Sequence, residues 1–282
     1  MKKLFFIPLF CLSFFWINPN TVKSQVNDGI YDKEHVPSRR RVNYSYLREA
    51  DVMWKKRIWR IIDLREKINH PLYFPTQKLG DRMSLMQLLL WGITNEGLSV
   101  YSTDDDNFTA PMTRKQVDVE MGAVADTIPI VNPDTGEEEM QIIPGEIHTE
   151  EIKQFLVKEE WYFDRQLSVM KVRIIGICPI RFFIKDDDVT KTIRKTRVFW
   201  VYFPEVRRIL ANHGTFNTFN DAERKTFDDI FEKRYFNSFI VQETNVFNDR
   251  PISEYAQGIE ALLEANRIKD KLFRSEQDLW EY

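Results

Sequence analysis

The stretch from Tyr46 to Pro71 constrains the fold most, because it joins a regular apolar pattern to a definite end. Its apolar residues recur at steps of four, three and seven, and so share one face of a helix: Trp54, Ile58, Ile61 and Ile68. The proline ring lacks a backbone donor and disfavours helical geometry in the residue before it. The pattern therefore predicts a long amphipathic helix that ends at Pro71.

A basic cluster occupies the first half of this predicted helix and consists of Lys55, Lys56, Arg57 and Arg60. The preceding segment, residues 25–45, has few regularly spaced apolar positions and carries Arg39, Arg40 and Arg41, so we expect an extended basic arm. A triple arginine is consistent with a solvated charge run or with a docking segment for an acidic partner or lipid headgroups. We expect the apolar face of the helix to pack inward and the basic cluster to remain free beside the arm.

The first 24 residues have the pattern of a secretory signal peptide. Two lysines precede an apolar run from Leu4 to Ile17, and Ser24 supplies a small residue before a cleavage site at Gln25. The apolar run is shorter than the roughly 20 residues that a membrane-spanning helix needs, which disfavours the alternative of a retained anchor. Cys11 follows Phe10 rather than the small residue that a lipidation site requires.

The charge balance and the cysteine content disfavour nucleic-acid binding and a disulfide-stabilised fold. Without residues 1–24 the chain has 37 basic and 43 acidic side chains, a balance that disfavours general nucleic-acid binding. Only Cys178 then remains, so no intrachain disulfide can form. Stability must come from packing, for which the aromatic content of 13% is ample.

The second quarter of the chain predicts a buried helix and then a hairpin. Ser84 and Gln87 have capping-box spacing before LMQLLLWGITNEG, which is apolar nearly all round and stops near Gly97. Residues 102–145 form an insertion with a short helical piece at 112–121 and a protruding β-hairpin around 132–136. Two aspartate triplets, 104–106 and 186–188, lack the spacing of a calcium loop, so solvated turns are favoured over metal sites.

The remaining chain predicts strands followed by helices. Residues 161–184 and 196–204 are rich in β-branched and aromatic residues with connections too short for crossover helices, which indicates an antiparallel meander. Gly176 in this region indicates a bulge or a close approach. We expect a helix capped by Asn220 and Glu223, a strand within 236–243, and a long helix from Pro251 almost to Tyr282. The predicted fold is a single α+β domain, 46–282, with a mixed or antiparallel sheet flanked by helices.

Catalytic and cofactor motifs are absent from the sequence. The four histidines are scattered without zinc spacing, and there is no GxSxG, Walker or GxGxxG motif, so we predict no metal, no cofactor and no enzyme. Cys178 and His213 are the one nucleophile and base pair that a hydrolase hypothesis can use. A buried, inert thiol is favoured for Cys178, which lies between apolar residues in a predicted strand.

Several separated aromatic-rich blocks resemble the GldN/PorN family of gliding-motility and type IX secretion proteins of the Bacteroidota. They are IWRIIDLREKINHPLYFP, VRIIGICPI followed by VFWVYFPEVR, DDIFEKRYFNSFIVQE, GIEALLEANRIKDKL and DLWEY. The resemblance spans Tyr46 to Tyr282. It implies a non-enzymatic periplasmic protein, associated with the outer membrane through a lipoprotein of the GldK/PorK type in a ring-like assembly. It also implies contact with the periplasmic region of the GldM/PorM motor protein.

These expectations assign partner contact to specific residues. We expect the arm and the basic cluster to form one docking surface for the lipoprotein: Arg39, Arg40, Arg41, Lys55, Lys56, Arg57 and Arg60. Trp280 is added because an aromatic residue near a terminus has little of its own domain to pack against. The alternative function is a periplasmic glycan or peptidoglycan-binding module that uses exposed tryptophans.

Overall fold

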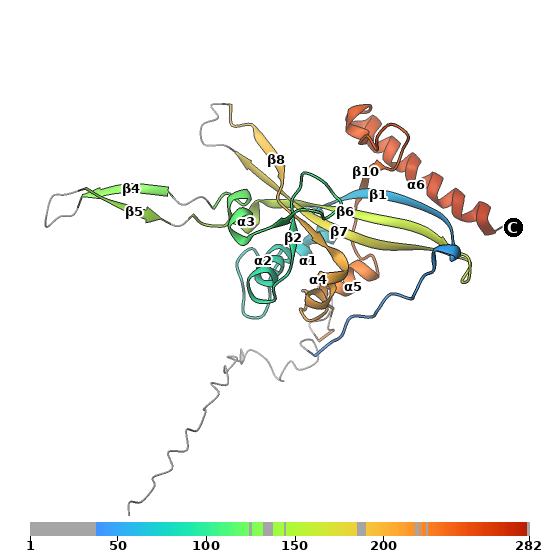
Figure 1. The fold of residues 1–282 in the computed structure, drawn as a ribbon, viewed down its shortest axis with the longest axis horizontal. Coiled ribbons are helices and arrows are strands. Elements are labelled where there is room, and N and C mark those ends of the chain that lie inside the picture. Colours follow the sequence, from blue (N-terminus) through green and yellow to red (C-terminus); the bar gives the residue numbers. More distant parts are fainter. Residues whose placement is uncertain are drawn as a thin grey trace, which may run out of the picture. The chain divides into compact units, whose positions relative to one another are not determined.

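An eight-stranded antiparallel sheet forms the centre of the computed structural model, with helices packed against it (Figure 1). The structure describes residues 38–123, 126–131, 138–143, 145–184, 190–217, 220, 222–223 and 225–280. The predicted export segment, arm residues 25–37, the hairpin turn 132–136 and the aspartates at 186–188 lie outside the described residues. The predicted α+β class is confirmed, and every described strand pairing is antiparallel.

The strands of this sheet follow the order β10-β1-β6-β7-β9-β2-β3, and β8 pairs with β7. In chain order they are β1 (Val52–Asp63), β2 (Val100–Tyr101), β3 (Pro111–Met112), β6 (Ile152–Asp164), β7 (Val169–Ile184), β8 (Ile193–Arg197), β9 (Trp200–Tyr202) and β10 (Phe239–Glu243). The predicted antiparallel meander and the strand near 236–243 are therefore confirmed. β6 and β7 are the longest strands of the sheet, and both appear as long arrows in Figure 1.

The predicted helix at 46–71 is wrong, because its central part is strand β1. After a 3-10 turn at Glu49–Asp51, β1 pairs antiparallel with β6 from Val52 to Asp63 and with β10 on its other side. Both faces of the strand are covered. Trp59 packs with Leu156 and Trp200, while Ile58 packs with the last helix. Tryptophan and isoleucine suit a pleated surface that is buried on both sides, and this tertiary burial outweighs the helical spacing.

The α-helix in this region begins only near Pro71, where the sequence predicted that a helix would end. A 3-10 turn, Lys67–Asn69, leads into the short helix α1 (His70–Tyr73). Pro71 stands in the first turn of α1, where its missing backbone donor needs no partner within the helix. The proline therefore helps to start a helix rather than to stop one.

The buried helix after Ser84 is confirmed as α2 (Leu85–Asn95). The Gln87 backbone amide donates to Ser84 Oγ at 3.3 Å, and the Ser84 backbone amide donates to Gln87 Oε1 at 3.1 Å, which completes the predicted capping box. The short helical piece is also confirmed, as α3 (Arg114–Glu120). α2 packs with α4 (Phe203–Ala211) and α5 (Phe227–Glu232) in the largest buried cluster, which includes Phe155, Phe203 and Phe231.

Two helix starts differ from the predictions. α5 is capped by Thr226 with Asp229, not by Asn220 with Glu223. The C-terminal helix α6 spans Ile259–Trp280, and its predicted first turn is instead a separate 3-10 turn at Ile252–Glu254. Gly258 precedes α6 with a φ of +59°, a left-handed conformation that breaks the run between the two. Helix α6 is therefore about 33 Å long, shorter than expected, at 1.5 Å per residue.

The predicted hairpin is confirmed and is separate from the main sheet. Its strands β4 (Asp126–Val131) and β5 (Glu138–Ile143) pair only with each other and form a two-stranded sheet of their own. A 3-10 turn at Thr149–Glu151 then leads into β6. The hairpin therefore precedes the longest strand pair in the chain and adds no strand to the main sheet.

Gly176 is a close-approach site in β7, as its position in a strand predicted. A Cβ atom there would lie 2.5 Å from the Phe108 ring and 3.2 Å from the Trp200 ring. The β6 register also shifts beside it, between Lys158 and Glu159, so a bulge is present as well. Phe108 reaches Gly176 from the loop between β2 and β3, with a φ of +59°. The glycine therefore lets this loop lie directly on the sheet.

Replacement of Gly176 should reveal this contact. We expect Gly176→Ala to lower the free energy of unfolding by about 1–3 kcal/mol, because the new methyl group overlaps a packed ring. Urea unfolding measures the change. In a Phe108→Ala background the same replacement should cost clearly less, and an equal cost in both backgrounds would contradict the close contact with Phe108.

Candidate functional site

The basic arm is attached to the domain by two of its three arginines. The Arg39 guanidinium donates to both carboxylate oxygens of Asp229 on α5, at 2.7 and 2.8 Å. Arg41 donates to the backbone carbonyl of Pro204 in α4. Arg40, between them, is exposed. From Arg39 onward the arm is therefore held against α4 and α5, although all three arginines are exposed.

Tyr44 continues this attachment by packing among charged groups. The Arg207 guanidinium carbon lies 4.3 Å from the centroid of its ring, and that of Arg173 lies 5.1 Å away. Arg207 is almost fully buried and donates to both carboxylate oxygens of Asp228, at 2.8 and 3.1 Å. Burial raises the pKa of Tyr44 to about 12, which keeps the phenol neutral. The arm thus ends in a packed aromatic and arginine contact.

Three of the four predicted cluster residues on β1 form ion pairs with neighbouring strands. Lys56 Nζ lies 2.7 Å from Glu243 of β10. Arg57 and Lys55 lie 3.5 and 3.8 Å from the carboxylate of Glu160 on β6. Lys55 is the most exposed of the three, with 66% of its side chain accessible. The basic residues therefore meet acids that are distant in sequence.

Arg60, the fourth residue, belongs to a buried charge network. Glu159 is fully buried, and its carboxylate lies 2.9 Å from Arg234 and 3.7 Å from Arg60. Trp161 Nε1 donates to the same carboxylate at 3.1 Å. Burial lowers the pKa of Arg60 despite the nearby carboxylate. This network is part of the interior and is not presented to a partner.

The expectation of a free basic helix face is consequently wrong. The residues alternate between two faces of a strand, and four carboxylate contacts neutralise them. Of the predicted docking residues that the structure describes, Arg39, Arg40, Arg41 and Lys55 are exposed. The side chain of Trp280, the last residue of α6, lies outside the described residues. Contact of any of them with a partner stays a prediction.

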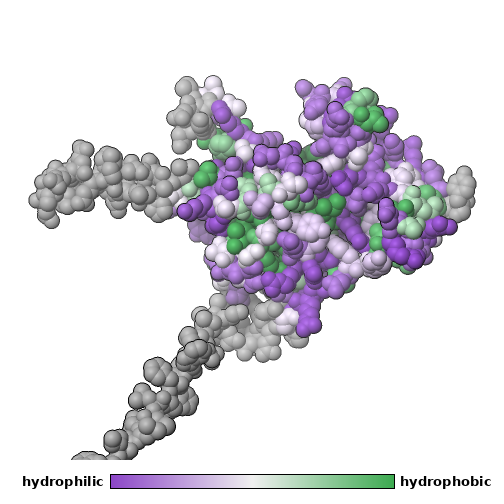
Figure 2. Space-filling model, viewed as in Figure 1, coloured by the Kyte–Doolittle hydropathy of each residue, from purple (hydrophilic) through white to green (hydrophobic). Residues whose placement is uncertain are grey.

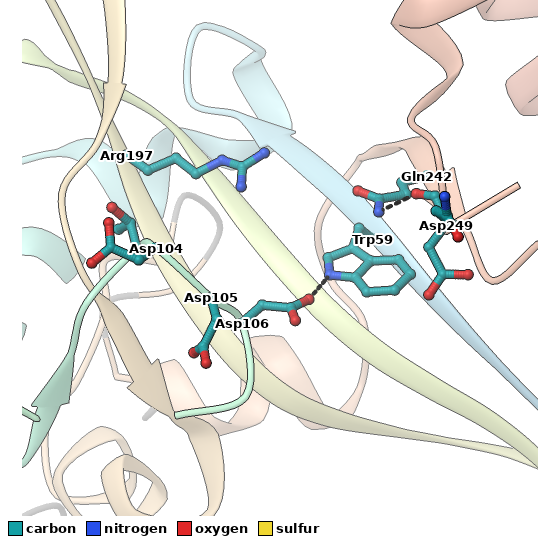
Figure 3. A pocket seen from close by; sticks show the side chains of 9 residues that line it. Trp59, Asp104, Asp105, Asp106, Arg197, Gln242 and Asp249 are labelled. Carbon is teal, nitrogen blue, oxygen red and sulfur yellow. Dashed lines mark hydrogen bonds between the residues drawn. The ribbon is translucent and has the colours of Figure 1, made fainter. Parts of the chain in front are cut away.

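An acidic pocket lies between the loop after β2 and the end of β10 (Figure 3). It has a volume of about 300 Å³ and is lined by Trp59, Thr103, Asp104, Asp105, Asp106, Arg197, Gln242, Asn248 and Asp249. Figure 3 shows the Trp59 indole directed at Asp106, to which its Nε1 donates at 2.7 Å. The described residues contain no group of three or more side chains arranged to hold a metal ion.

Asp106 has a structural function that the sequence did not indicate. Lys158 of β6 is almost fully buried, and its Nζ donates to the Asp106 carbonyl at 2.6 Å and lies 3.2 Å from the Asp106 carboxylate. The aspartate triplet was predicted to be a solvated turn. One of its members instead compensates a buried lysine, a residue that rarely lies in a core without a partner. The only sequence signal was Lys158 itself within an apolar strand.

Cys178 and His213 lie in different environments. Cys178 is fully buried with Trp59 and Trp200, and burial raises the pKa of its thiol to about 12. His213 Nδ1 lies 2.9 Å from the Ile209 carbonyl oxygen, and its ring packs edge-on against Trp91. Within the described part of the chain no contact joins the two. A thiol with so high a pKa carries almost no thiolate at neutral pH, which removes the basis for a nucleophile.

The sequence after residue 24 predicts no helix that crosses a membrane. None of the helices within the described ranges combines the length and the apolar character that crossing a bilayer requires.

Comparison with protein-family models gave a match to "Gliding motility associated protein GldN" over residues 47–281. The matched range contains the whole sheet, all the described helices and the hairpin. A search of curated proteins found no match.

The buried network around Glu159 predicts a large effect of charge removal. We expect Glu159→Gln to lower the free energy of unfolding by about 3 kcal/mol, because Arg60 is left buried without its counter-charge. Urea unfolding followed by tryptophan fluorescence measures the loss. Glu160→Gln is the matched control, one residue along β6 and partly exposed, with an expected change under about 1 kcal/mol. Equal effects of the two variants would show that the buried network contributes no more to the free energy of unfolding than the exposed ion pairs of Glu160.

Proposed function

The chain belongs to the GldN family of gliding motility-associated proteins, and from this membership we propose that it is a periplasmic structural subunit of the type IX secretion and gliding machinery. In this proposal it forms a ring-like complex with an outer-membrane lipoprotein of the GldK/PorK type and contacts the periplasmic region of a GldM/PorM-type motor protein. The family match over 47–281 carries the proposal, because it spans nearly the whole domain.

The molecule has features that support an assembly role. The predicted export signal agrees with a periplasmic location. The described domain has a hairpin that pairs only with itself and a long terminal helix. Large apolar side chains are exposed on that helix and on the loop after β10, including Val246, Phe247, Ile259, Leu263 and Phe273. Ile259 and Leu263 are four residues apart and so lie together on α6, and adjacent exposed apolar side chains favour contact with other proteins.

The alternative of a glycan-binding module has less support. Stacking on a sugar requires an accessible aromatic face. The described tryptophan side chains are all buried or half-buried, namely those of Trp54, Trp59, Trp91, Trp161 and Trp200. Trp54 packs partly buried against the α6 side of the sheet. An enzymatic function also lacks support, because GldN is a motility family and Cys178 and His213 lie in separate environments.

Co-purification tests the proposal directly. We expect the protein to co-elute with the GldK/PorK-type lipoprotein of the same genome as a complex far larger than either component. Deletion of the protein should abolish secretion and gliding. A protein that stays monomeric with the lipoprotein present, in a deletion strain that still secretes, would contradict the proposal.

The exposed basic residues provide the sharper test of the docking surface. We expect Arg40→Glu combined with Lys55→Glu to weaken lipoprotein binding about tenfold and to alter its salt dependence, since rim charges act mainly through long-range attraction. Binding is measured by surface plasmon resonance at two salt concentrations. Lys115→Glu, on the exposed side of α3, is the matched control. Unchanged binding would exclude the arm and β1 from the interface.

A further inference from the structure

An apolar groove of about 740 Å³ crosses one face of the main sheet. Its floor is a row with one residue from each of the neighbouring strands β10, β1, β6, β7 and β8, in this order Phe239, Ile61, Leu156, Ile180 and Arg197. Ile61 is paired with both Phe239 and Leu156, and Ile180 is paired with Arg197. Paired residues of adjacent strands project from the same face of a sheet, so the row runs across the strands.

One wall of the groove comes from the segment between Pro251 and Leu262, which contains the 3-10 turn and the start of α6. Leu262 is 53% exposed, and its neighbours on the helix, Ile259 and Leu263, are 76% and 62% exposed. Figure 2 shows a hydrophobic patch among hydrophilic residues in the region where α6 begins. The groove therefore opens beside apolar side chains whose removal from water is favourable.

The three central strands of the floor have no free backbone groups on this face. β1, β6 and β7 are each paired on both sides, so their backbone donors and acceptors are directed within the sheet. A peptide that lay across the row would leave its own amide groups without partners there, which costs free energy for each group buried. A hydrocarbon chain has no such groups. The floor therefore fits an acyl chain better than an extended peptide.

Arg197 places a positive charge at the β8 end of this row. It is the single charged residue among the described lining residues of the groove, and no hydrogen bond or ion pair joins its guanidinium to another described residue. A guanidinium binds phosphate through two parallel hydrogen bonds, and such charge-assisted bonds are roughly twice as strong as neutral ones. An acyl chain in the row would therefore carry its anionic group at Arg197.

The acidic pocket adjoins the groove, because Arg197 and Gln242 line both. Figure 3 shows the Arg197 guanidinium directed into this pocket. Asp104, Asp105 and Asp249 accept hydrogen bonds from uncharged donors, and no ion pair joins them to another residue in the described part of the chain. Their charges disfavour a purely anionic head group and favour one that carries an ammonium beyond its phosphate.

We propose that this cleft binds a phospholipid with an ethanolamine head group. One acyl chain lies along the row from Ile180 to Phe239, the phosphate accepts hydrogen bonds from Arg197, and the ammonium donates to the carboxylates of the acidic pocket. The order of tail, anion and cation in the lipid matches the order of apolar row, arginine and carboxylates in the protein. This lipid site goes beyond the proposed assembly role and does not depend on it.

Titration of the purified protein without residues 1–24 with palmitoyl lysophosphatidylethanolamine tests the site. Below the micelle concentration of this probe, isothermal titration calorimetry measures its dissociation constant and the number of molecules bound, and we expect one molecule per chain. Arg197→Gln removes the guanidinium, and Leu262→Asp places a carboxylate in the apolar wall. Each variant should raise the dissociation constant at least about tenfold.

Two matched controls distinguish loss of the site from a general change in surface charge. Lys195→Gln removes a positive charge two residues before Arg197 on β8, and Phe273→Asp adds a negative charge to an α6 residue that is 60% exposed. Neither residue lines the groove, so both variants should bind the lipid as the unaltered protein does. Circular dichroism checks that each variant is folded.

The head group is tested with palmitoyl lysophosphatidylglycerol, which has the same tail and phosphate without the ammonium. We expect this probe to bind about tenfold more weakly than the ethanolamine lipid, and Asp104→Asn to reduce the difference. The proposal would be overturned by an absence of binding of the ethanolamine lipid, by equal effects of the site variants and their controls, or by equal affinity for the two head groups. The lipoprotein is absent from this experiment, so its result is distinct from that of the co-purification test.

Discussion

Pairing of β1 with β6 determines the position of most of the remaining structure. β1 joins β10 to the sheet, and β6 joins the long strand β7, so these two strands connect the α6 side with the α2, α4 and α5 side. Both strands are covered on their two faces. Every polar side chain that the pairing draws inward then needs a partner inside the protein, because water is excluded. Glu159 meets two arginines for this reason, and Lys158 meets Asp106.

The features that the sequence predicted correctly are those set by residues close together in the chain. The capping box of Ser84 and Gln87 joins positions three apart, and the hairpin at 126–143 follows from turn residues between apolar runs. β1 was misassigned because its apolar residues fit a helical period, and its basic residues were expected in solvent. Their partners Glu159, Glu160 and Glu243 are remote in sequence, so a local pattern contains no sign of them.

The candidate site was predicted only in part for the same reason. Arginines in an arm are visible in a sequence, but the acids and carbonyls that hold them are not. Arg39 pairs with Asp229, 190 residues away, and Arg41 contacts Pro204. Arg39, Arg41, Lys55, Lys56 and Arg60 all have partners within the protein, which leaves less free positive charge than the sequence suggested. The surface that remains most distinctive is apolar, along β10 and the start of α6.

Glu159 also has a consequence for the order in which the chain folds. Its two arginine partners come from β1, early in the chain, and from the segment after α5, late in the chain. During synthesis Arg60 emerges first, Glu159 second and Arg234 last. A sheet of β1, β6 and β7 formed before the last quarter emerges would offer the carboxylate only its more distant arginine, Arg60. The charge therefore favours completion of the core as one cooperative step after residue 234 has emerged.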